Sequence, residues 1–338
     1  MEPAADPARP RQALFDSDDA GPALPVCDHY AGVEARMRKS LQLQAAMGPV
    51  FDVTLDNEDG APVGGEVEHA HLIASLLASP DNQHGRVGVR LLPVDHPRFD
   101  DVLRAVLGAA VRPAYLMLPK PHGLSDVELA ARAVAAAGGA SVPLHALIET
   151  HGALREVFAI AAHPRIESLS FGLMDFVSAH RGAISQSAMS ADGQFDHPLI
   201  IRAKLEIAAA CHTHAKTPSH CVVTEFKDLD ALESAAERAC TLLGYTRMWS
   251  IHPDQIRPIV EAFAPRVAEV DQAIEIIAAA QAARWAPISH RHGKETRLHD
   301  RASYRYYWQV IERAHRPSFK GAPQLPAELC LAWFGTAD

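Results

Sequence analysis

The sequence predicts an α/β protein built as a (β/α)₈ TIM barrel with a C-terminal helical arm. Short apolar, β-prone segments alternate with Ala- and Leu-rich segments of helical periodicity. Eight such strand–helix pairs follow one another, and eight pairs favour closure into a barrel over an open doubly wound sheet. No predicted strand is followed by a GxGxxG turn, which disfavours a dinucleotide-binding sheet.

The strand–helix pairs can be located from these patterns. The predicted strands lie at residues 23–27, 50–55, 87–91, 115–118, 144–148, 168–171, 221–223 and 248–251. The predicted helices lie at residues 32–46, 66–77, 98–107, 125–137, 154–161, 199–211, 229–243 and 255–263. Buried strands that alternate with helices in this way are typical of a parallel sheet covered by helices.

We expect the chain to have three parts: a tail at residues 1–20, the barrel at 21–265 and the arm at 266–338. The first part is rich in aspartate and lacks the apolar core of a signal peptide, which predicts a mobile segment. Helical patterns at 267–284 and 304–315 flank a polar, basic stretch after the barrel. An appendage of about 70 residues is large enough to be a lid or to reach a neighbouring subunit.

Composition excludes several classes of partner. The formal net charge of −9 gives no basic footprint for nucleic acid. No segment approaches the roughly 20 continuous apolar residues of a membrane span, so no membrane partner is expected. The five cysteines form no CxxC pair, which predicts reduced thiols in a cytoplasmic protein.

Two carboxylates follow neighbouring predicted strands. Glu149 comes directly after residues 144–148, and Asp175 follows the next strand along the chain. Because functional side chains of such a barrel sit where strands end, we expect the two acids at the same rim. Mg²⁺ is usually held by one or two carboxylates together with water and substrate oxygens. The alternative is that Glu149 caps the next helix and Asp175 binds a nearby amide.

Two basic residues and two further acids occupy equivalent positions. Arg90 ends the third strand, where it could bind a substrate carboxylate or an enolate, or form a structural ion pair. Glu58 and Asp59 follow the second strand in a polar turn. Lys120 follows the fourth strand. A Schiff-base role for Lys120 is conceivable, but an ion pair to Glu58 or Asp59 is favoured.

Six segments in order resemble the HpcH/HpaI aldolase/citrate lyase family, in its citrate lyase β-subunit/malyl-CoA lyase branch. They resemble the family's "DLEDA", "VRVN", "LPK", "LIET", "FGxxDF" and "IHPxQI" strings, and they lie at residues 51–60, 89–93, 118–120, 147–150, 171–176 and 250–256. Each string is modest by itself. Together they cover about residues 50–256 and imply the barrel fold of the family.

The resemblance implies a carbon–carbon lyase that uses Mg²⁺, with Mn²⁺ as the alternative ion. It implies that Glu149 and Asp175 are the metal ligands. Arg90 would stabilise an enolate, and Asp300, from the arm of another subunit, would be the acid/base. Substrate contacts are expected from Arg90, Glu58, Asp59, Lys120 and Gly172. The assembly implied by the swapped arm is a homotrimer or a hexamer.

The sequence also departs from the family pattern. The first strand lacks the family's "RSLLFVPG"-like run, and Leu91-Leu92 replaces the residues after its arginine. Three functions therefore stay open. The first is a lyase for a hydroxy acid or a 3-hydroxyacyl-CoA such as malyl-, citramalyl- or citryl-CoA. The second is a class II aldolase that forms pyruvate without CoA, and the third is a non-catalytic barrel subunit.

Overall fold

The computed structural model describes residues 9–15, 23–292, 295–317 and 324–335. The chain divides into two compact units. The first is Gly21–Phe263, which we call the barrel unit. The second joins the described residues of 1–20 to those of 264–338, and we call it the C-terminal unit.

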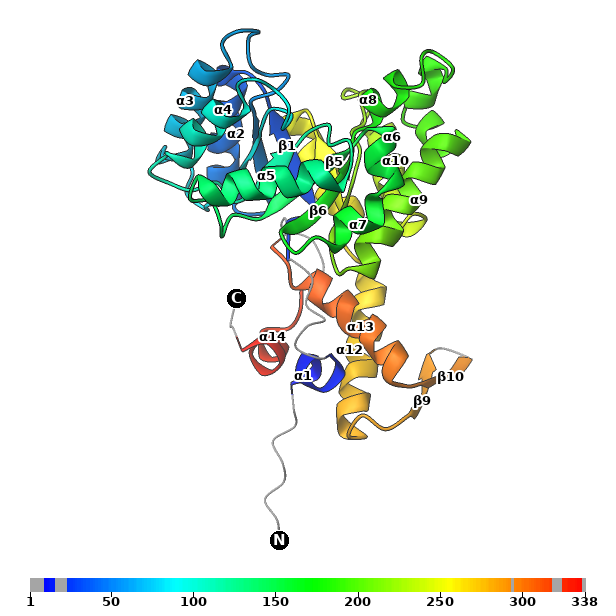
Figure 1. Cartoon of the computed structure of the whole chain (residues 1–338). Helices are drawn as coiled ribbons and strands as arrows, with labels where there is room; N and C mark the ends of the chain where they lie inside the picture. Colours follow the sequence, from blue (N-terminus) through cyan, green and yellow to red (C-terminus); the bar gives the residue numbers. More distant parts are fainter. Residues whose placement is uncertain (1–8, 16–22, 293–294, 318–323, 336–338) are drawn as a thin grey trace. The chain divides into compact units, whose positions relative to one another are not determined.

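The barrel unit contains eight parallel strands that pair in sequence order, with β8 closing on β1. Figure 1 shows β1, β5 and β6 of this sheet with helices around them. The strands are β1 (Cys27–Ala31), β2 (Phe51–Asp56), β3 (Val87–Arg90), β4 (Leu116–Leu118), β5 (Leu144–Ile148), β6 (Ile166–Phe171), β7 (Thr217–His220) and β8 (Arg247–Ser250). The predicted (β/α)₈ fold is confirmed by this closed topology.

Helices connect successive strands and cover the barrel. They are α2 (Glu34–Met47), α3 (Glu66–Leu77), α4 (Phe99–Leu107), α5 (Leu124–Ala136), α6 (His151–Arg155), α7 (Val157–Ala162), α8 (Leu173–Ser178), α9 (Pro198–Thr213), α10 (Leu229–Thr241) and α11 (Ile256–Phe263). Short 3₁₀ turns η1 (Gln186–Met189) and η2 (Gly193–Phe195) lie between α8 and α9, and η3 (Pro253–Gln255) precedes α11. The connection after β6 is therefore longer than a single helix.

The N-terminal ends of the strands enclose an ionic group of Asp28, Asp52, Arg86 and Arg247, which we call the lower cluster. Arg247 Nη1 donates to Asp52 Oδ2 at 2.6 Å, and Arg247 Nη2 lies 3.1 Å from Asp28 Oδ2. Arg86 donates twice to Asp52, at 2.7 and 2.9 Å. Two aspartates face two arginines, so the formal charges of the cluster balance.

Aromatic and apolar side chains fill the barrel above the lower cluster. Tyr115 crosses the interior, stacks on His145 with ring centroids 4.0 Å apart, and donates to Asp28 at 3.0 Å. Position 88 is glycine because an added Cβ there would lie 2.2 Å from the Tyr115 ring. Tyr115, Met117, Leu147 and Trp249 form one buried apolar cluster. This cluster separates the two ends of the barrel.

Two strands lie away from their predicted positions. The predicted first strand, 23–27, was wrong by several residues, since β1 is Cys27–Ala31. The predicted seventh strand, 221–223, was also wrong, since β7 is Thr217–His220. Both strands are buried yet rich in polar residues. The search for apolar segments therefore selected neighbouring residues instead.

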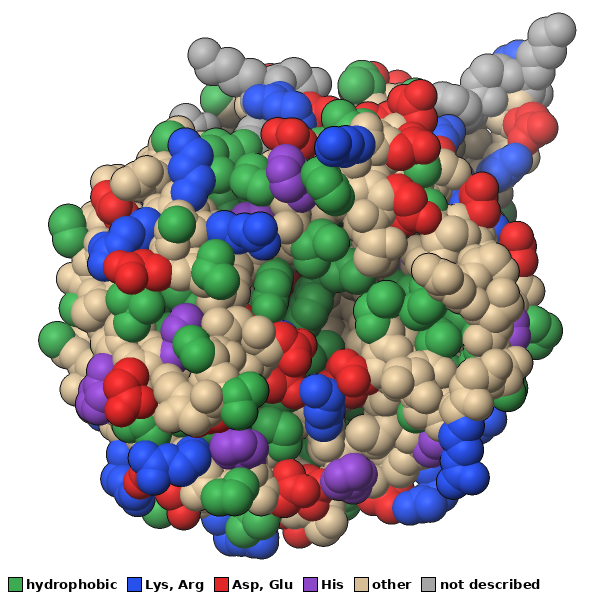
Figure 2. Space-filling model, turned by 90° about the horizontal axis from the view of Figure 1, so that it is seen from above, with side chains coloured by type: hydrophobic (Ala, Val, Ile, Leu, Met, Phe, Trp, Pro, Cys, Tyr) green, Lys and Arg blue, Asp and Glu red, His purple; other side chains and the backbone are tan. Residues whose placement is uncertain are grey.

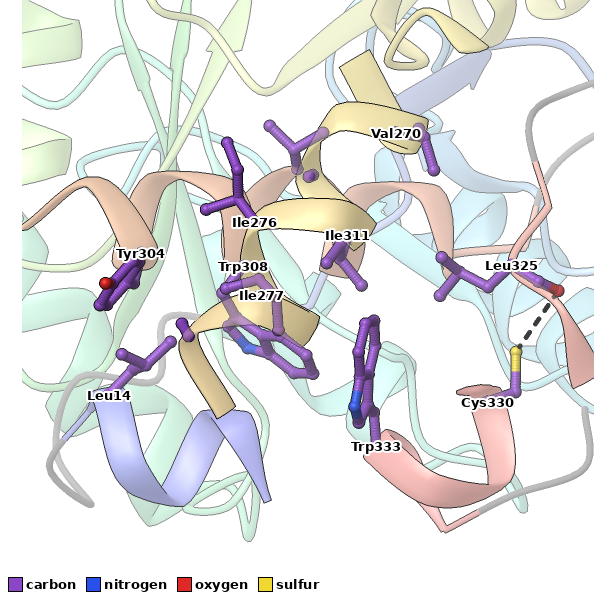
Figure 3. Packing of buried hydrophobic residues seen from close by; sticks show 13 residues of the cluster. Leu14, Val270, Ile276, Ile277, Tyr304, Trp308, Ile311, Leu325, Cys330 and Trp333 are labelled. Carbon is purple, nitrogen blue, oxygen red and sulfur yellow. Dashed lines mark hydrogen bonds between the residues drawn. The ribbon is translucent and has the colours of Figure 1, made fainter. Parts of the chain in front are cut away.

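The C-terminal unit is built around its own apolar cluster (Figure 3). Its elements are α1 (Pro10–Leu14), α12 (Val267–Ala282), β9 (Ile288–His292), β10 (Glu295–His299), α13 (Arg301–Ala314) and α14 (Ala327–Phe334). Leu14, Trp308 and Trp333 are buried in this cluster. Sequence analysis did not predict α1, α14 or the antiparallel pairing of β9 with β10. Helix α1 forms because Leu14 packs into the core of this unit.

Two further observations concern the cysteines and the length and polarity of the helices. All five cysteines are free thiols. In the part of the chain that the structure describes, no helix combines the length and the apolar character needed to cross a lipid bilayer.

Candidate active site

The two acids predicted as metal ligands both reach Lys120 at the C-terminal ends of the strands. Glu149 follows β5 directly, and its Oε1 accepts a hydrogen bond from the Lys120 backbone N–H at 2.8 Å. Asp175 lies in the first turn of α8, and its Oδ1 is 3.8 Å from Lys120 Nζ. The structure therefore brings these side chains to one side of the barrel mouth.

Glu149 is buried, with 3% of its surface exposed. Burial, together with the negative charge of Asp175, raises the pKa of Glu149 to about 8. The Asp175 side chain is 45% exposed. A cation close to both groups would stabilise the ionised form of Glu149, because an opposite charge favours it.

Gly172 gives the Glu149 carboxylate its room. A Cβ at position 172 would lie 2.2 Å from Glu149 Oε2 and 2.6 Å from Glu149 Cβ. Any other residue here would displace the carboxylate. Gly172 was predicted to contact substrate, and its position shows a steric contribution to the placement of Glu149.

Arg90 is held by three carboxylates. Its Nε donates to Asp56 at 2.5 Å, its Nη1 lies 3.0 Å from Glu58, and its Nη2 donates to Asp59 at 2.9 Å. Burial by itself would lower the pKa of Arg90, but Asp56 and the neighbouring acids raise it well above its usual range. Arg90 is 5% exposed, whereas the Asp59 side chain is 61% exposed. Asp59 therefore lies on the open side of the guanidinium.

Sequence analysis missed two side chains that position Arg90. Asp56 is the last residue of β2, and Tyr30 lies on β1. The Tyr30 hydroxyl donates to Asp56 at 2.5 Å, and the Arg90 guanidinium lies 5.2 Å from the centroid of the Tyr30 ring. Asp56 ends a strand just as Arg90 does, so its strand-end position was the signal that could have found it.

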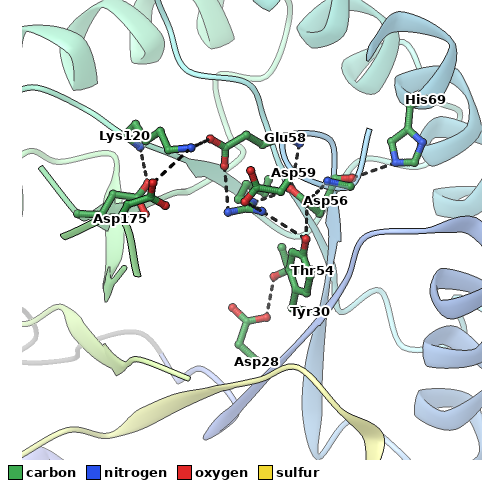
Figure 4. A network of polar contacts seen from close by, with 12 residues as sticks. Asp28, Tyr30, Thr54, Asp56, Glu58, Asp59, His69, Lys120 and Asp175 are labelled. Atoms are coloured by element: carbon green, nitrogen blue, oxygen red, sulfur yellow. Dashed lines mark hydrogen bonds and ion pairs between the residues drawn. The ribbon is translucent and has the colours of Figure 1, made fainter. Parts of the chain in front are cut away.

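Lys120 connects the arginine group to the two acids (Figure 4). Its Nζ donates to Glu58 at 2.5 Å and approaches Asp175, so the ion pair to Glu58 favoured by sequence analysis is present. Burial would lower the pKa of Lys120, but the contact with Glu58 raises it above its usual value. A Schiff base needs a neutral amine, so these contacts disfavour that role. Lys120 also has a φ of 49°, an uncommon conformation for a residue with a side chain.

These side chains make up what we call the upper cluster: Asp56, Glu58, Asp59, Arg90, Lys120, Glu149 and Asp175. It contains five carboxylates and two basic groups, so negative charge is in excess. Among the described residues, no group of three or more His, Cys, Asp and Glu side chains could hold a metal ion by itself. Glu149 and Asp175 alone suit Mg²⁺, which commonly takes one or two carboxylates and completes its shell with water and substrate.

The face that carries α8 is hollowed at its centre (Figure 2). Hydrophobic side chains lie inside the hollow, and acidic and basic side chains lie beside it. A small ligand could therefore place its charged groups on the rim and its carbon atoms inside. This division of the surface is typical of small-molecule sites.

Asp300 belongs to the C-terminal unit and is the N-cap of α13. Its Oδ1 accepts hydrogen bonds from the backbone N–H groups of Ala302 and Ser303, at 3.0 and 3.3 Å. The residue is exposed. Its predicted acid/base role stays a prediction, and the structure adds a structural role as a helix cap.

Comparisons with known proteins identify a family and relatives that the chain resembles. The family model described as HpcH/HpaI aldolase/citrate lyase matches residues 39–253. The chain is 29% identical over 286 residues to the L-malyl-CoA/beta-methylmalyl-CoA lyase of Cereibacter sphaeroides, covering 80% of this chain and 89% of that protein.

Two solved structures are similar to the structure of this chain. The crystal structure of a citrate lyase from Burkholderia xenovorans LB400 is 52% identical, with a TM-score of 0.80, and the match covers 92% of this chain and 98% of that one. The protein CitE of Mycobacterium tuberculosis, in complex with magnesium, acetoacetate and coenzyme A, is 20% identical with a TM-score of 0.68. That match covers 87% of this chain and 99% of the other.

Proposed function

The chain belongs to the HpcH/HpaI aldolase/citrate lyase family, and on that premise we propose that it is a magnesium-dependent carbon–carbon lyase. The observation that carries the proposal is the excess of carboxylates in the upper cluster, where Glu149 is buried beside Asp175 with its pKa raised to about 8. The family resemblance that sequence analysis found is confirmed by the match to the family model.

Glu149 and Asp175 would hold the metal, Mg²⁺ or alternatively Mn²⁺. When bound, such an ion acts as a Lewis acid and as a template for the oxygen atoms of a hydroxy or oxo acid. Lys120 orients Glu149 through its backbone N–H and neutralises part of the charge of Asp175 through its Nζ. Gly172 keeps space for the Glu149 carboxylate.

Arg90 would bind the anionic end of the reacting group. Asp56 and Glu58 fix the guanidinium from its buried side. Asp59 is the exposed partner, so a substrate carboxylate or an enolate oxygen can replace it on Nη2. A fixed guanidinium at this position stabilises the negative charge that develops when the carbon–carbon bond breaks.

The group that moves the proton has to come from outside the upper cluster. Asp56, Glu58 and Asp59 contact Arg90, and Glu149 and Asp175 are the proposed metal ligands. In cleavage, a base takes the proton of the substrate hydroxyl, the carbon–carbon bond breaks, and the enolate of the acyl fragment is then protonated at carbon. We assign this work to Asp300 of a neighbouring subunit in a homotrimer or hexamer.

Free cysteines suit a reducing compartment such as the cytoplasm.

The substrate class follows from the relatives. The C. sphaeroides relative is named as a lyase of malyl-CoA and beta-methylmalyl-CoA, and the M. tuberculosis structure holds coenzyme A with magnesium. We therefore propose a 3-hydroxyacyl-CoA substrate of the malyl-, citramalyl- or citryl-CoA type. A pyruvate-forming aldolase without CoA is the first alternative. The second alternative is a barrel subunit that catalyses no reaction.

The test is turnover of the purified full-length protein with acetyl-CoA and glyoxylate, with Mg²⁺ or with EDTA, and the reverse cleavage of malyl-CoA. Malyl-CoA formed only with Mg²⁺ supports the proposal. Free CoA with malate would indicate thioester hydrolysis, and pyruvate release from a CoA-free hydroxy-oxo acid would indicate the aldolase. Glu149→Gln is the matched variant: it keeps the shape of the side chain and removes its charge, so it should lose the Mg²⁺-dependent turnover. No metal-dependent turnover of any of these substrates would overturn the proposal.

A further inference from the structure

An apolar layer lies below Glu149, one of the two proposed metal ligands. Leu147 lies on β5, and Glu149 follows two residues later, directly after the strand, so both side chains point to the interior of the barrel. Leu147 packs with Tyr115, Met117 and Trp249, and Ala114 and Val222 pack against this group. The site therefore has a charged rim and an apolar floor.

Trp249 connects this floor to the arginine side of the rim. Its ring stacks on Tyr30, with centroids 6.2 Å apart and an interplanar angle of 19°. Tyr30 in turn donates to Asp56, which holds Arg90. A shift of the Trp249 ring would therefore alter the position of Arg90 through Tyr30 and Asp56.

The polar end of Trp249 has no partner among the described residues. The indole Nε1 is buried and makes no hydrogen bond, and the whole residue is 8% exposed. Ser170 and Ser219, which pair across β6 and β7, likewise have buried hydroxyls without a partner. A buried indole N–H usually has an acceptor, so a ligand or water oxygen is the expected partner of the Trp249 Nε1.

We propose that Trp249 is a specificity-determining residue of the lyase site. Its ring, with Met117 and Leu147, forms the floor on which the carbon skeleton of a short-chain oxo acid rests, and its Nε1 donates to an oxygen of that ligand. The ring limits the length of the carbon chain, because the apolar layer beneath the rim is already filled by large side chains. This proposal rests on the proposed function and adds the feature that selects the substrate.

Trp249 supplies its own spectroscopic signal. The chain has four tryptophans, and Trp285, Trp308 and Trp333 all belong to the C-terminal unit. Addition of glyoxylate to the Mg²⁺-loaded full-length protein should change the tryptophan emission. Trp249→Phe should lose that change while calorimetry still detects weakened binding, and Trp285→Phe should keep it. An emission change that survives in Trp249→Phe would overturn the assignment.

Chain-length selectivity is the second readout. Trp249→Leu opens the floor, so the preference for glyoxylate over 2-oxobutyrate, measured as a ratio of binding constants with Mg²⁺, should fall about tenfold or more. 2-Oxobutyrate is longer by two carbons, and a single methylene in a closed pocket already discriminates by about that factor. Trp285→Phe should leave the ratio unchanged. An unchanged ratio in folded Trp249→Leu would overturn the proposal.

The binding ratio needs no turnover, so it separates this proposal from the lyase assignment. Loss of selectivity in Trp249→Leu without any carbon–carbon cleavage in the wild type would support the floor and overturn the lyase function. Normal cleavage by the wild type, together with unaltered selectivity in Trp249→Leu, would support the lyase function and overturn the floor.

Discussion

The barrel holds an ionic cluster at each end, and the two differ in charge balance and in exposure. In the lower cluster, Asp28, Asp52 and Arg247 have side chains that are at most 1% exposed, and two arginines face two aspartates. In the upper cluster, five carboxylates face two basic groups, and the side chains of Asp59 and Asp175 are 61% and 45% exposed. Similar residue types thus produce two different environments.

The difference shows which cluster serves the fold and which serves chemistry. A balanced, enclosed network satisfies its own charges and positions the strands that contribute to it. An acidic network with open positions remains incomplete until a cation and a ligand arrive. Position in the barrel agrees with this division, because active sites of such barrels lie at the C-terminal ends of the strands.

The largest expected effect is the loss of Asp175 from the upper cluster. Asp175→Asn should lower Mg²⁺-dependent kcat/KM by more than about a thousandfold, because a bound metal contributes several kcal/mol of transition-state stabilisation. The melting temperature should hardly change, since the side chain is 45% exposed and lies 3.8 Å from its Lys120 partner. Asp192→Asn is the matched control, as Asp192 is an exposed acid 3.4 Å from Arg238. Equal activity in the two variants would contradict the metal site.

The second effect concerns a group that the upper cluster lacks, a carboxylate free to move a proton. Asp300→Asn should lower kcat by roughly a hundredfold or more, as expected when a general acid/base is lost. Its stability should remain, because asparagine is as good an N-cap as aspartate. Asp300→Ala should lose the same activity and also about 1 kcal/mol of stability. Full activity of Asp300→Asn would leave Asp300 as a helix cap alone.

The lower cluster should respond in stability and not in turnover. Arg247→Met leaves Asp28 and part of Asp52 without their cation, and breaking a buried pair of this kind costs about 3–5 kcal/mol. Urea unfolding should show this loss, whereas kcat/KM of the folded protein should stay within about threefold of wild type. Arg86→Met should cost less, because its side chain is 28% exposed and Arg247 still contacts Asp52. A folded Arg247→Met variant without activity would refute the division between the clusters.

The two clusters also explain what the sequence could and could not reveal about the fold. Strands β2, β3, β4, β5, β6 and β8 were found because each contains at least two large apolar residues (Val, Ile, Leu, Met, Phe or Trp). Strands β1 and β7 were misplaced because Asp28, Tyr30 and Ser219 are polar although they are buried. Polar residues inside a barrel obey no hydrophobic pattern, since their partners come from strands far away in the sequence.

The candidate site was partly predictable for a related reason. Glu149, Asp175, Arg90 and Lys120 end or follow strands, and strand ends can be counted along a sequence. The roles of Tyr30 and Asp56 depend on contacts between β1, β2 and β3 that only the closed barrel creates. Trp249 lies in a predicted strand, but its unpaired Nε1 and its packing against Leu147 can be known only from the structure.

The smallest effect tests the charge imbalance itself. The pKa of Glu149 in the metal-free protein is raised to about 8, so between its ordinary value and 8 the unfolded chain is ionised there while the folded chain keeps its proton. The free energy of unfolding of metal-free protein should therefore fall by about 1 kcal/mol per pH unit over this range from Glu149 alone. Urea unfolding at pH 6, 7 and 8 measures this slope.

Glu149→Gln isolates the contribution of Glu149, because every other titrating group is retained. The difference in stability between the metal-free variant and the metal-free wild type should grow as the pH rises towards 8 and level off above it. Saturating Mg²⁺ should reduce the decline in the wild type, since a cation beside Glu149 replaces its proton. Parallel pH profiles for the two metal-free proteins would mean that the upper cluster is as well compensated as the lower one, and the contrast between the two ends of the barrel would be lost.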